Sequence, residues 1–578
     1  GGLIQGAGAE AFVTVRSLTE TRIGTTGSTT ILSETGAVII AASHAATVDS
    51  QLDNRAGALI GASGANARTT VFSRVTTNIG GAANLYARDF DISAGNNVLR
   101  PYRDYNIKSA SGGAIDVPAM ISRVTVDAVT DLNVLDGAEI IQTGDAFNPG
   151  FFNLGISTDM SLSDRLFLDA GGAVAVPIGD SNVRVASNNA TVTIGAATLL
   201  SLGEMSIYNG GNANLRSEVD STSYGLAGAA TSITRATYNA ANVIRLNSGA
   251  DLESLDDIRL MAGHLKTSVQ SITIRAEARA FNKTAFPINI DPVADATANT
   301  TSRLDIGEGS NVTAVRDVYL LSEAGRRDVL GYGRGKDLYR QVAAEIANAL
   351  GSLVGADDVS LDIETGRSID TSDDGILVNG KVRAGSRNKQ VLILGLDGSG
   401  NYELRNDRTR QEANSNLFYD NAWAEDIGWT LTRNVAPSVD LQNRIDELNG
   451  YLANPALTDD DGDIFTGGVL TASTDPIRQA WISELVTLRQ RQALVAGLRV
   501  DWIKLDPILA VEGNIFMRAD YVQGTATGEL NAPGDALIKV WIRTGAWLET
   551  DSMTIPTAEG GRITLNDVLV NNTNDVRI

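Results

Sequence analysis

The chain contains no cysteine among its 578 residues. It can therefore form no disulfide, no thiolate nucleophile and no cysteine-ligated zinc or iron–sulfur centre. Imidazole is almost as scarce, because His44 and His264 are the only histidines and lie far apart in the sequence. A histidine-rich metal site or a Ser–His hydrolase therefore has little material to draw on. These absences favour a structural role for the protein over a catalytic one.

Positive charge is also scarce, since 47 Lys and Arg residues face 69 Asp and Glu residues and leave a net charge of −22. Binding nucleic acid through its phosphates requires a cationic surface, so the composition excludes a general nucleic-acid binder. Hydrophobic residues make up 43% of the chain, enough to bury a core, which argues against disorder. The longest apolar runs, such as residues 37–42, are much shorter than the roughly 20 residues of a membrane-spanning helix. We expect no transmembrane segment.

The first residues, Gly1-Gly2-Leu3, do not open a basic stretch followed by an apolar one, which is the pattern of a secretory signal peptide. The sequence ends in the polar tract 571–578. We therefore expect an internal or processed piece of a longer, soluble protein.

A recurring strand motif is abundant. It has two apolar residues at alternate positions, a glycine three positions later, and usually a small residue and another apolar position. The copies are Leu132-x-Val134-x-x-Gly137, Ile244-x-Leu246-x-x-Gly249, Leu304-x-Ile306-x-x-Gly309 and Leu361-x-Ile363-x-x-Gly366. Alternation with a period of two indicates a β-strand with one buried face. Glycine at a fixed corner supplies a backbone conformation that a Cβ resists.

The repeat predicts an all-β fold, namely a right-handed parallel β-helix with α-helical insertions. Self-similarity at periods of 20 to 60 residues is typical of stacked solenoids. Gly249, Gly309 and Gly366 are spaced 60 and 57 positions apart, which we interpret as three coils of about 20 residues each. An array of β-sandwiches is the alternative. It requires antiparallel hairpins with Asn-Gly turns, and these are few here.

Helical patterns interrupt the strands. Leu338, Val342, Ile346 and Leu350 recur at four-residue steps and predict a helix at about 337–353. Residues 438–498 predict an inserted helical hairpin, in which Asp475-Pro476 caps the second helix. The expected organisation is a β-helix over 1–437, the hairpin over 438–498, and a continuing β-helix or β-rich segment over 499–578.

One cluster of carboxylates suggests a metal site. Asp459, Asp461 and Asp463 alternate as the oxygen ligands of calcium loops do. An EF-hand also needs Gly at 464 and Glu at 470, where this chain has Ile464 and Leu470. These three residues are therefore a candidate Ca²⁺ site, and a solvated loop tip between helices is the alternative.

A second motif, Gly331-Tyr332-Gly333-Arg334-Gly335-Lys336, resembles a phosphate-binding loop. Leu330 and Asp337 stand where that loop requires Gly and Ser or Thr, and an acid at 337 would repel phosphate. We interpret the motif as a flexible turn before the helix.

No residue can be assigned a catalytic role. His44 and His264 follow apolar strand patterns and have no acid or second histidine at a matching sequence spacing. Arg259 and Arg316 could lie on a strand face, as arginines do in β-helical polysaccharide lyases, but solvated outward positions explain them equally well. A glycosidase carboxylate pair stays open, since its partners meet only in space.

The recurring strand motif, the absence of cysteine and the abundance of small residues resemble the filamentous-haemagglutinin type of two-partner-secreted adhesin, and the nearest match is the large leukotoxin-like filamentous adhesins. The segment Leu530-Asn531-Ala532-Pro533-Gly534-Asp535-Ala536 adds to the resemblance, as do Ile555-Pro556 and Gly560-Gly561-Arg562-Ile563. The resemblance implies an extracellular or cell-surface bacterial rod that is exported through an outer-membrane pore. It supplies no catalytic residues.

The expected function is thus structural and adhesive and not enzymatic. The expected partners are other copies of the chain or neighbouring segments of the same giant chain, and cell surfaces or glycans. No cofactor is expected apart from the candidate Ca²⁺. Two rival functions are a β-helical polysaccharide lyase or hydrolase, which needs a groove lined by acids and bases, and a surface-layer or sheath subunit.

Overall fold

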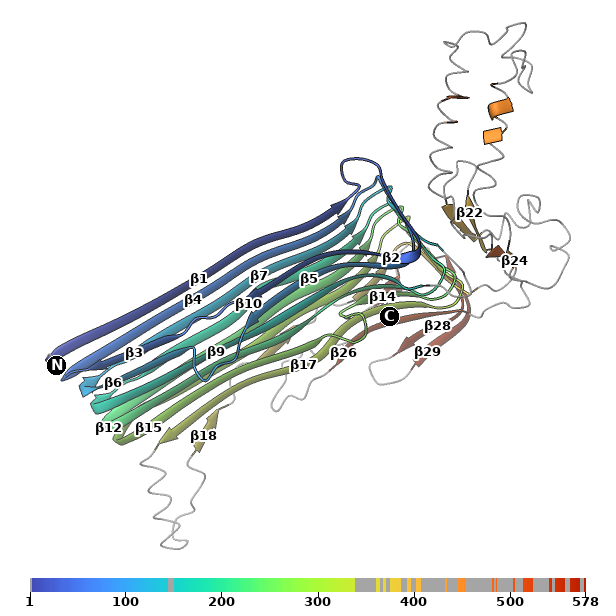
Figure 1. Cartoon of the computed structure of the whole chain (residues 1–578). Helices are drawn as coiled ribbons and strands as arrows, with labels where there is room; N and C mark the ends of the chain where they lie inside the picture. The colour runs from blue at the N-terminus through green and yellow to red at the C-terminus, as the bar shows by residue number, and fades with distance from the viewer. Residues whose placement is uncertain are drawn as a thin grey trace.

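The chain folds as a stack of parallel β-coils (Figure 1). The computed structural model describes residues 3–143 and 150–337 continuously, and beyond them only shorter stretches up to residue 577. Each coil has an outgoing part, a corner and a return part, and from the third coil onward the corner is a separate short strand. Equivalent strands of successive coils pair in parallel and form one 26-stranded sheet. The predicted all-β, parallel, repeat-like architecture is therefore confirmed.

The outgoing strands make one face of the stack. They are β1 (Ile4–Ile23), β4 (Ile60–Ile79), β7 (Ala119–Val134), β10 (Ile178–Ile194), the second parts of β12 (Met205–Leu246) and β15 (Ser271–Ile306), β19 (Arg367–Asp370), β20 (Gly375–Val378) and β27 (Val540–Ile542).

The return strands make the opposite face, and the corner strands join the two. The return strands are β2 (Thr29–Thr47) with β3 (Leu52–Gly57), β5 (Ala83–Arg100) with β6 (Ile107–Asp116), β9 (Phe152–Ala175), the first part of β12, β14 (Ile258–Ala262) with the first part of β15, β17 (Val318–Asp337) and β26 (Asn514–Val522). The corner strands are β8 (Glu139–Gln142), β11 (Thr198–Ser201), β13 (Asp251–Ser254), β16 (Asn311–Ala314), β21 (Lys381–Ala384) and the start of β28 (Trp547–Pro556).

The expected coil of about 20 residues is wrong. Residues in register on neighbouring coils lie 56 positions apart between Arg16 and Phe72, and 60 apart between Leu246 and Ile306. The 60-residue unit of the sequence is therefore one coil and not three. The reason is strand length, since β9 runs for 24 residues and its alternation continues without a turn.

The core lies between the two faces and is built of aliphatic ladders. One ladder joins residues at the same place on seven successive coils: Ile23, Ile79, Val134, Ile194, Leu246, Ile306 and Val378. The last six are fully or almost fully buried. Only Ile23, on the first coil, is half-buried. Burial of each such side chain stabilises the stack by about 1.5–3 kcal/mol. Leu246 and Ile306 belong to one parallel ladder, as predicted, but they are direct neighbours and not three coils apart.

The corner glycines behave as the repeat predicted, with one exception. Gly137, Gly249 and Gly309 have φ angles of 86°, 82° and 78°, which a Cβ disfavours. The fourth copy is misassigned, because Leu361 and Ile363 lie in β18 (Ser360–Ile363), which pairs antiparallel with the end of β17. Ile376 and Val378 occupy the equivalent ladder positions instead.

The turn predicted at 331–336 is also wrong. Residues Gly331 to Lys336 lie inside β17 and pair in register with Ala276 to Phe281 of β15. Asp337, the expected start of a helix, is the last residue of that strand. The rest of the predicted helix, up to residue 353, lies outside the described residues.

The predicted hairpin 438–498 lies mostly outside the described residues. Those described there, which include Ile445, Leu448 and Leu485, are helical and buried at these three positions. No helix with defined bounds occurs within the described part of the chain, so the hairpin stays a prediction.

The chain leaves the stack after β21 and re-enters it at β26, which pairs with β17 one coil below. Between these points, β22 (Leu392–Leu396) pairs with β23 (Tyr402–Asn406), and β24 (Thr432–Arg433) with β25 (Ile503–Lys504), both antiparallel and outside the large sheet. After re-entry, β27 and β28 continue the parallel stack. The final strands, β29 (Arg562–Asn571) and β30 (Val576–Arg577), pair antiparallel with them.

The described body is a flat block. An outgoing strand of 20 residues spans about 65 Å, and eight stacked outgoing strands spaced by about 4.8 Å rise only about 34 Å. Long coils therefore give broad, flat faces and little height per residue.

Candidate functional site: the arginine face

Most of the residues singled out in the sequence have structural roles or are not described. Asp459, Asp461 and Asp463 lie outside the described residues. Within the part of the chain that is described, no group of three or more His, Asp or Glu side chains could hold a metal ion. Arg316 pairs with Asp256 at 2.7 Å, and Arg259 pairs with Glu204 at 3.0 Å.

The two histidines also have partners in the fold. His44 Nδ1 lies 3.0 Å from Asn96 Oδ1 on the neighbouring coil. His264 is buried, and its Nε2 lies 2.6 Å from a carboxylate oxygen of Glu323, which also pairs with Arg518. Sequence spacing missed this partner because it lies one coil away, on the strand paired with β14. A search at an offset of about 60 residues would have found it.

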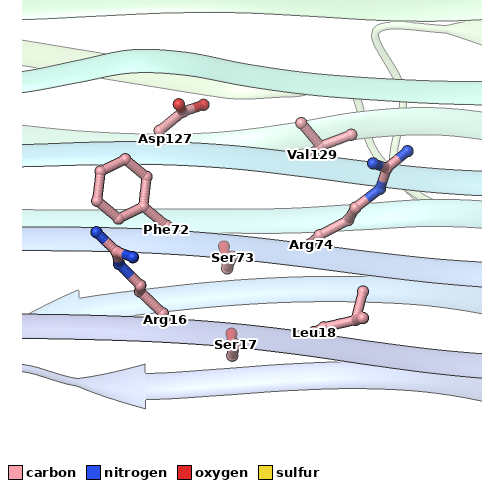
Figure 2. Close-up of a pocket in the computed structure, with 8 residues that line it drawn as sticks. All are labelled: Arg16, Ser17, Leu18, Phe72, Ser73, Arg74, Asp127 and Val129. Carbon is pink, nitrogen blue, oxygen red and sulfur yellow. The ribbon is translucent and has the colours of Figure 1, made fainter.

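A groove of about 530 Å³ lies on the outer side of β1, β4 and β7 (Figure 2). Two columns of outward side chains form it. Arg16, Phe72 and Asp127 are in register in one column, and Leu18, Arg74 and Val129 in the next. The columns are adjacent because alternate residues of a strand point to the same face. Figure 2 shows Arg16 below the Phe72 ring and Arg74 to the right, near Val129.

The groove offers two partly free guanidinium groups. Arg16 lies 5.4 Å from the centroid of the Phe72 ring, an attractive cation–π contact. Arg74 is 64% exposed and forms an ion pair with Asp131 at 3.6 Å. Burial raises the pKa of Asp131, and Arg74 opposes this shift. Asp127 accepts a hydrogen bond from the Ser187 hydroxyl.

The groove belongs to a larger cationic surface, which we name the arginine face: Arg16, Arg68, Arg74, Arg123 and Arg184. Arg68 and Arg123 are directly in register, an arrangement of like charges that destabilises a sheet. Arg123 is compensated by Asp180 at 2.6 Å. Arg68 and Arg184 are exposed and form no ion pair with any described residue.

The return face provides a contrast. There, Arg165 contacts Glu218 at 3.3 Å and Asp220 at 3.1 Å, and Arg279 contacts Glu277 at 2.9 Å and Asp220 at 3.5 Å. In that network each arginine is paired with two carboxylates, so no guanidinium is left to bind an anionic ligand. The arginine face has five arginines and three neighbouring carboxylates, namely Asp127 in the groove, Asp131 beside Arg74 and Asp180 beside Arg123. Positive charge therefore remains in excess, and the face retains the capacity to bind an anion.

Side chains on the inner side of the same sheet form hydrogen bonds that fix the strands of the arginine face. Ser73, between Phe72 and Arg74, points inward and donates to Asn96 Oδ1 at 3.0 Å. Thr69, next to Arg68, accepts from the buried guanidinium of Arg100 at 3.1 Å. The strands carrying the groove are therefore fixed by buried hydrogen bonds, which makes the surface rigid.

The groove is suited to binding and not to proton transfer. Its charged lining groups are Arg16, Arg74 and Asp127, and arginine stays protonated at any ordinary pH. Comparison with family models, with curated proteins and with solved structures gives no match. No helix in the described part of the chain is long and apolar enough to cross a membrane.

Proposed function

We propose that this chain is a structural and adhesive segment of a large secreted or cell-surface bacterial protein, a right-handed parallel β-helix that presents flat faces to partners. The observation that supports this is the parallel pairing of equivalent strands through successive coils, which local register shifts do not interrupt. Each internal strand satisfies its backbone hydrogen bonds through the strands on either side, so the stack resists bending and shear. A right-handed path is the one that parallel crossovers follow in nearly all proteins.

Further features fit an adhesive role. The lack of cysteine suits export as an unfolded chain through an outer-membrane pore. The arginine face provides a contact surface on an otherwise acidic molecule. Helical insertions and the candidate Ca²⁺ site at 459–463 would extend such contacts beyond the stack, and each stays part of the proposal.

The proposed function is tested with beads that carry the full chain, placed under flow over surfaces coated with bacterial or host cell-surface polysaccharide. We expect retention of the beads, and no release of shortened polysaccharide. Beads carrying the chain unfolded by urea and washed are the control. Loss of retention on every surface would contradict adhesion, and depolymerisation of the coating would instead support a polysaccharide lyase or hydrolase.

A further inference from the structure

We propose that the groove on the arginine face binds a carboxylate-bearing sugar unit of an acidic polysaccharide. The inference deepens the adhesive function proposed above and depends on it. It names the ligand class, the groove residues that contact the ligand and the outer arginines that extend the contact.

The anionic part of the ligand follows from the unbalanced charge. Arg16 and Arg74 flank the groove, and the only carboxylate among its lining residues is Asp127, which already accepts from Ser187. The planar fork of a guanidinium matches a carboxylate with two parallel hydrogen bonds. The chain carries a net charge of −22, so a face with an excess of arginine is the part of the described surface that would attract an acidic polymer.

The sugar part follows from the remaining lining. Leu18 and Val129 give the groove an apolar side that suits the C–H face of a pyranose ring, and Asp127 can accept hydrogen bonds from sugar hydroxyls. A volume of about 530 Å³ falls within the usual range for small-molecule sites.

A polymer is favoured over a free sugar because the cationic surface continues past the groove. Arg68 and Arg123 lie two positions beyond the Thr70 and Thr125 column, and Arg184 lies on the next strand. A chain of uronate units seated in the groove would therefore pass further guanidinium groups on the same flat face. Multiple weak contacts of this kind raise the overall affinity.

The experiment measures binding of the full chain to immobilised polygalacturonate by biolayer interferometry, at low and at physiological salt. The test variant is Arg16→Gln/Arg74→Gln. The matched control is Arg245→Gln, because Arg245 lies on the same outer face, is similarly exposed, and stands 3.7 Å from its carboxylate partner Asp305, as Arg74 stands 3.6 Å from Asp131.

We expect the wild type to bind polygalacturonate and not neutral dextran, with weaker binding at higher salt. The double variant should lose at least tenfold in affinity, and Arg245→Gln less than twofold. Equal losses in the two variants would overturn the site, since net charge alone would then explain binding. Binding of dextran sulfate but not polygalacturonate would overturn the carboxylate assignment.

The outcomes also separate this inference from the proposed function. Beads that are retained on other surfaces, while polygalacturonate fails to bind, would remove the uronate ligand and leave adhesion standing. Production of unsaturated uronate ends from the polymer would contradict both, because it would show lyase activity.

Discussion

At the scale of single residues, the interior of the stack contains a buried ion pair. The side chains of Arg100 and Asp164 are fully buried and lie 2.8 Å apart. Arg100 also donates to Ser50, to Thr69 and to the Ser163 carbonyl, while Asp164 accepts from Ser181. Full hydrogen bonding makes a buried charge tolerable, and these contacts join four successive coils.

The first prediction concerns this pair. Asp164→Leu should lower the free energy of unfolding by about 3–5 kcal/mol, because the Arg100 guanidinium would stay buried without its carboxylate. The double variant Arg100→Met/Asp164→Leu should lose clearly less than that single change. Urea unfolding followed by circular dichroism measures both. Simple additivity of the two single changes would contradict the coupling.

A second prediction concerns pH. Burial first, and then the nearby Asp251, raise the pKa of Glu253 well above its usual value, and Arg383 opposes them. The folded state therefore holds a proton that the unfolded state releases from about pH 4.3 upward. The stability it contributes is present below that pH and is lost as the pH rises through the folded-state pKa.

Replacing Glu253 by Gln removes this titration. Glu253→Gln should raise the free energy of unfolding at pH 7 and leave it nearly unchanged at pH 4, as measured by urea unfolding at both values. Glu308→Gln, at an exposed turn position, removes the same charge and should give no such gain. A gain of equal size at pH 4 and pH 7 would contradict the burial argument.

At the scale of the elements, the corner glycines allow the third prediction. Gly249 has a φ of 82°, and a Cβ on it would lie 2.8 Å from the Ala196 Cβ. Gly249→Ala should therefore destabilise the fold by about 1–3 kcal/mol. Gly171 is the control, since a Cβ there meets nothing within 4 Å, and Gly171→Ala should change stability by less than about 0.5 kcal/mol. Thermal unfolding compares the two, and similar losses would contradict a special role for the corner.

These elements also show what the sequence could predict. The motif around Leu246 and Gly249 marks the end of an outgoing strand and its corner, because both a buried pair and a left-handed glycine recur there. The same motif revealed the 60-residue period, but coils of about 20 residues would have put Leu246 and Ile306 three coils apart, whereas they are direct neighbours. Local alternation and one conformational requirement were sufficient for this part of the fold.

Coil length was not predictable in the same way. Alternation of apolar and polar residues indicates a strand but does not mark where the strand ends. Strands of five or six residues are the usual case, so short strands were expected. Here β9 has 24 residues. The glycine-rich stretch 331–336 was predicted to be a turn, yet every residue of it pairs with β15. Tertiary pairing overrides the turn preference of its glycines.

The groove was missed for a related reason. Arg16 and Phe72 are 56 positions apart, Phe72 and Asp127 are 55 apart, and a register shift follows at Val185 and Ser187. A constant offset therefore does not bring these residues together. Only the register of the strands reveals that five arginines share one face.

At the scale of the whole molecule, the stack continues across a large excursion. The chain leaves after Ala384 and returns at Asn514, and the two ends of the excursion are in contact. A Cβ on Gly513 would lie 2.0 Å from the Gly385 backbone nitrogen. The Gly385 amide donates to the Arg316 carbonyl at 2.9 Å, and the Asn514 amide donates to Asp317 at 2.8 Å. The coil below thus holds both ends in place.

The fourth prediction follows from that contact. Replacing residues 386–512 by a two- or three-residue glycine–serine linker should leave the parallel stack folded, because Gly385 and Gly513 already lie side by side and the closure entropy of so short a loop is small. The β-sheet circular dichroism and the urea midpoint should match those of the full chain. A matched control places the same linker across the central strand pairs by replacing 178–194, which removes β10 and should abolish folding. Unfolding of the stack by the first deletion would contradict the prediction and would show that the excursion contributes to the stability of the solenoid.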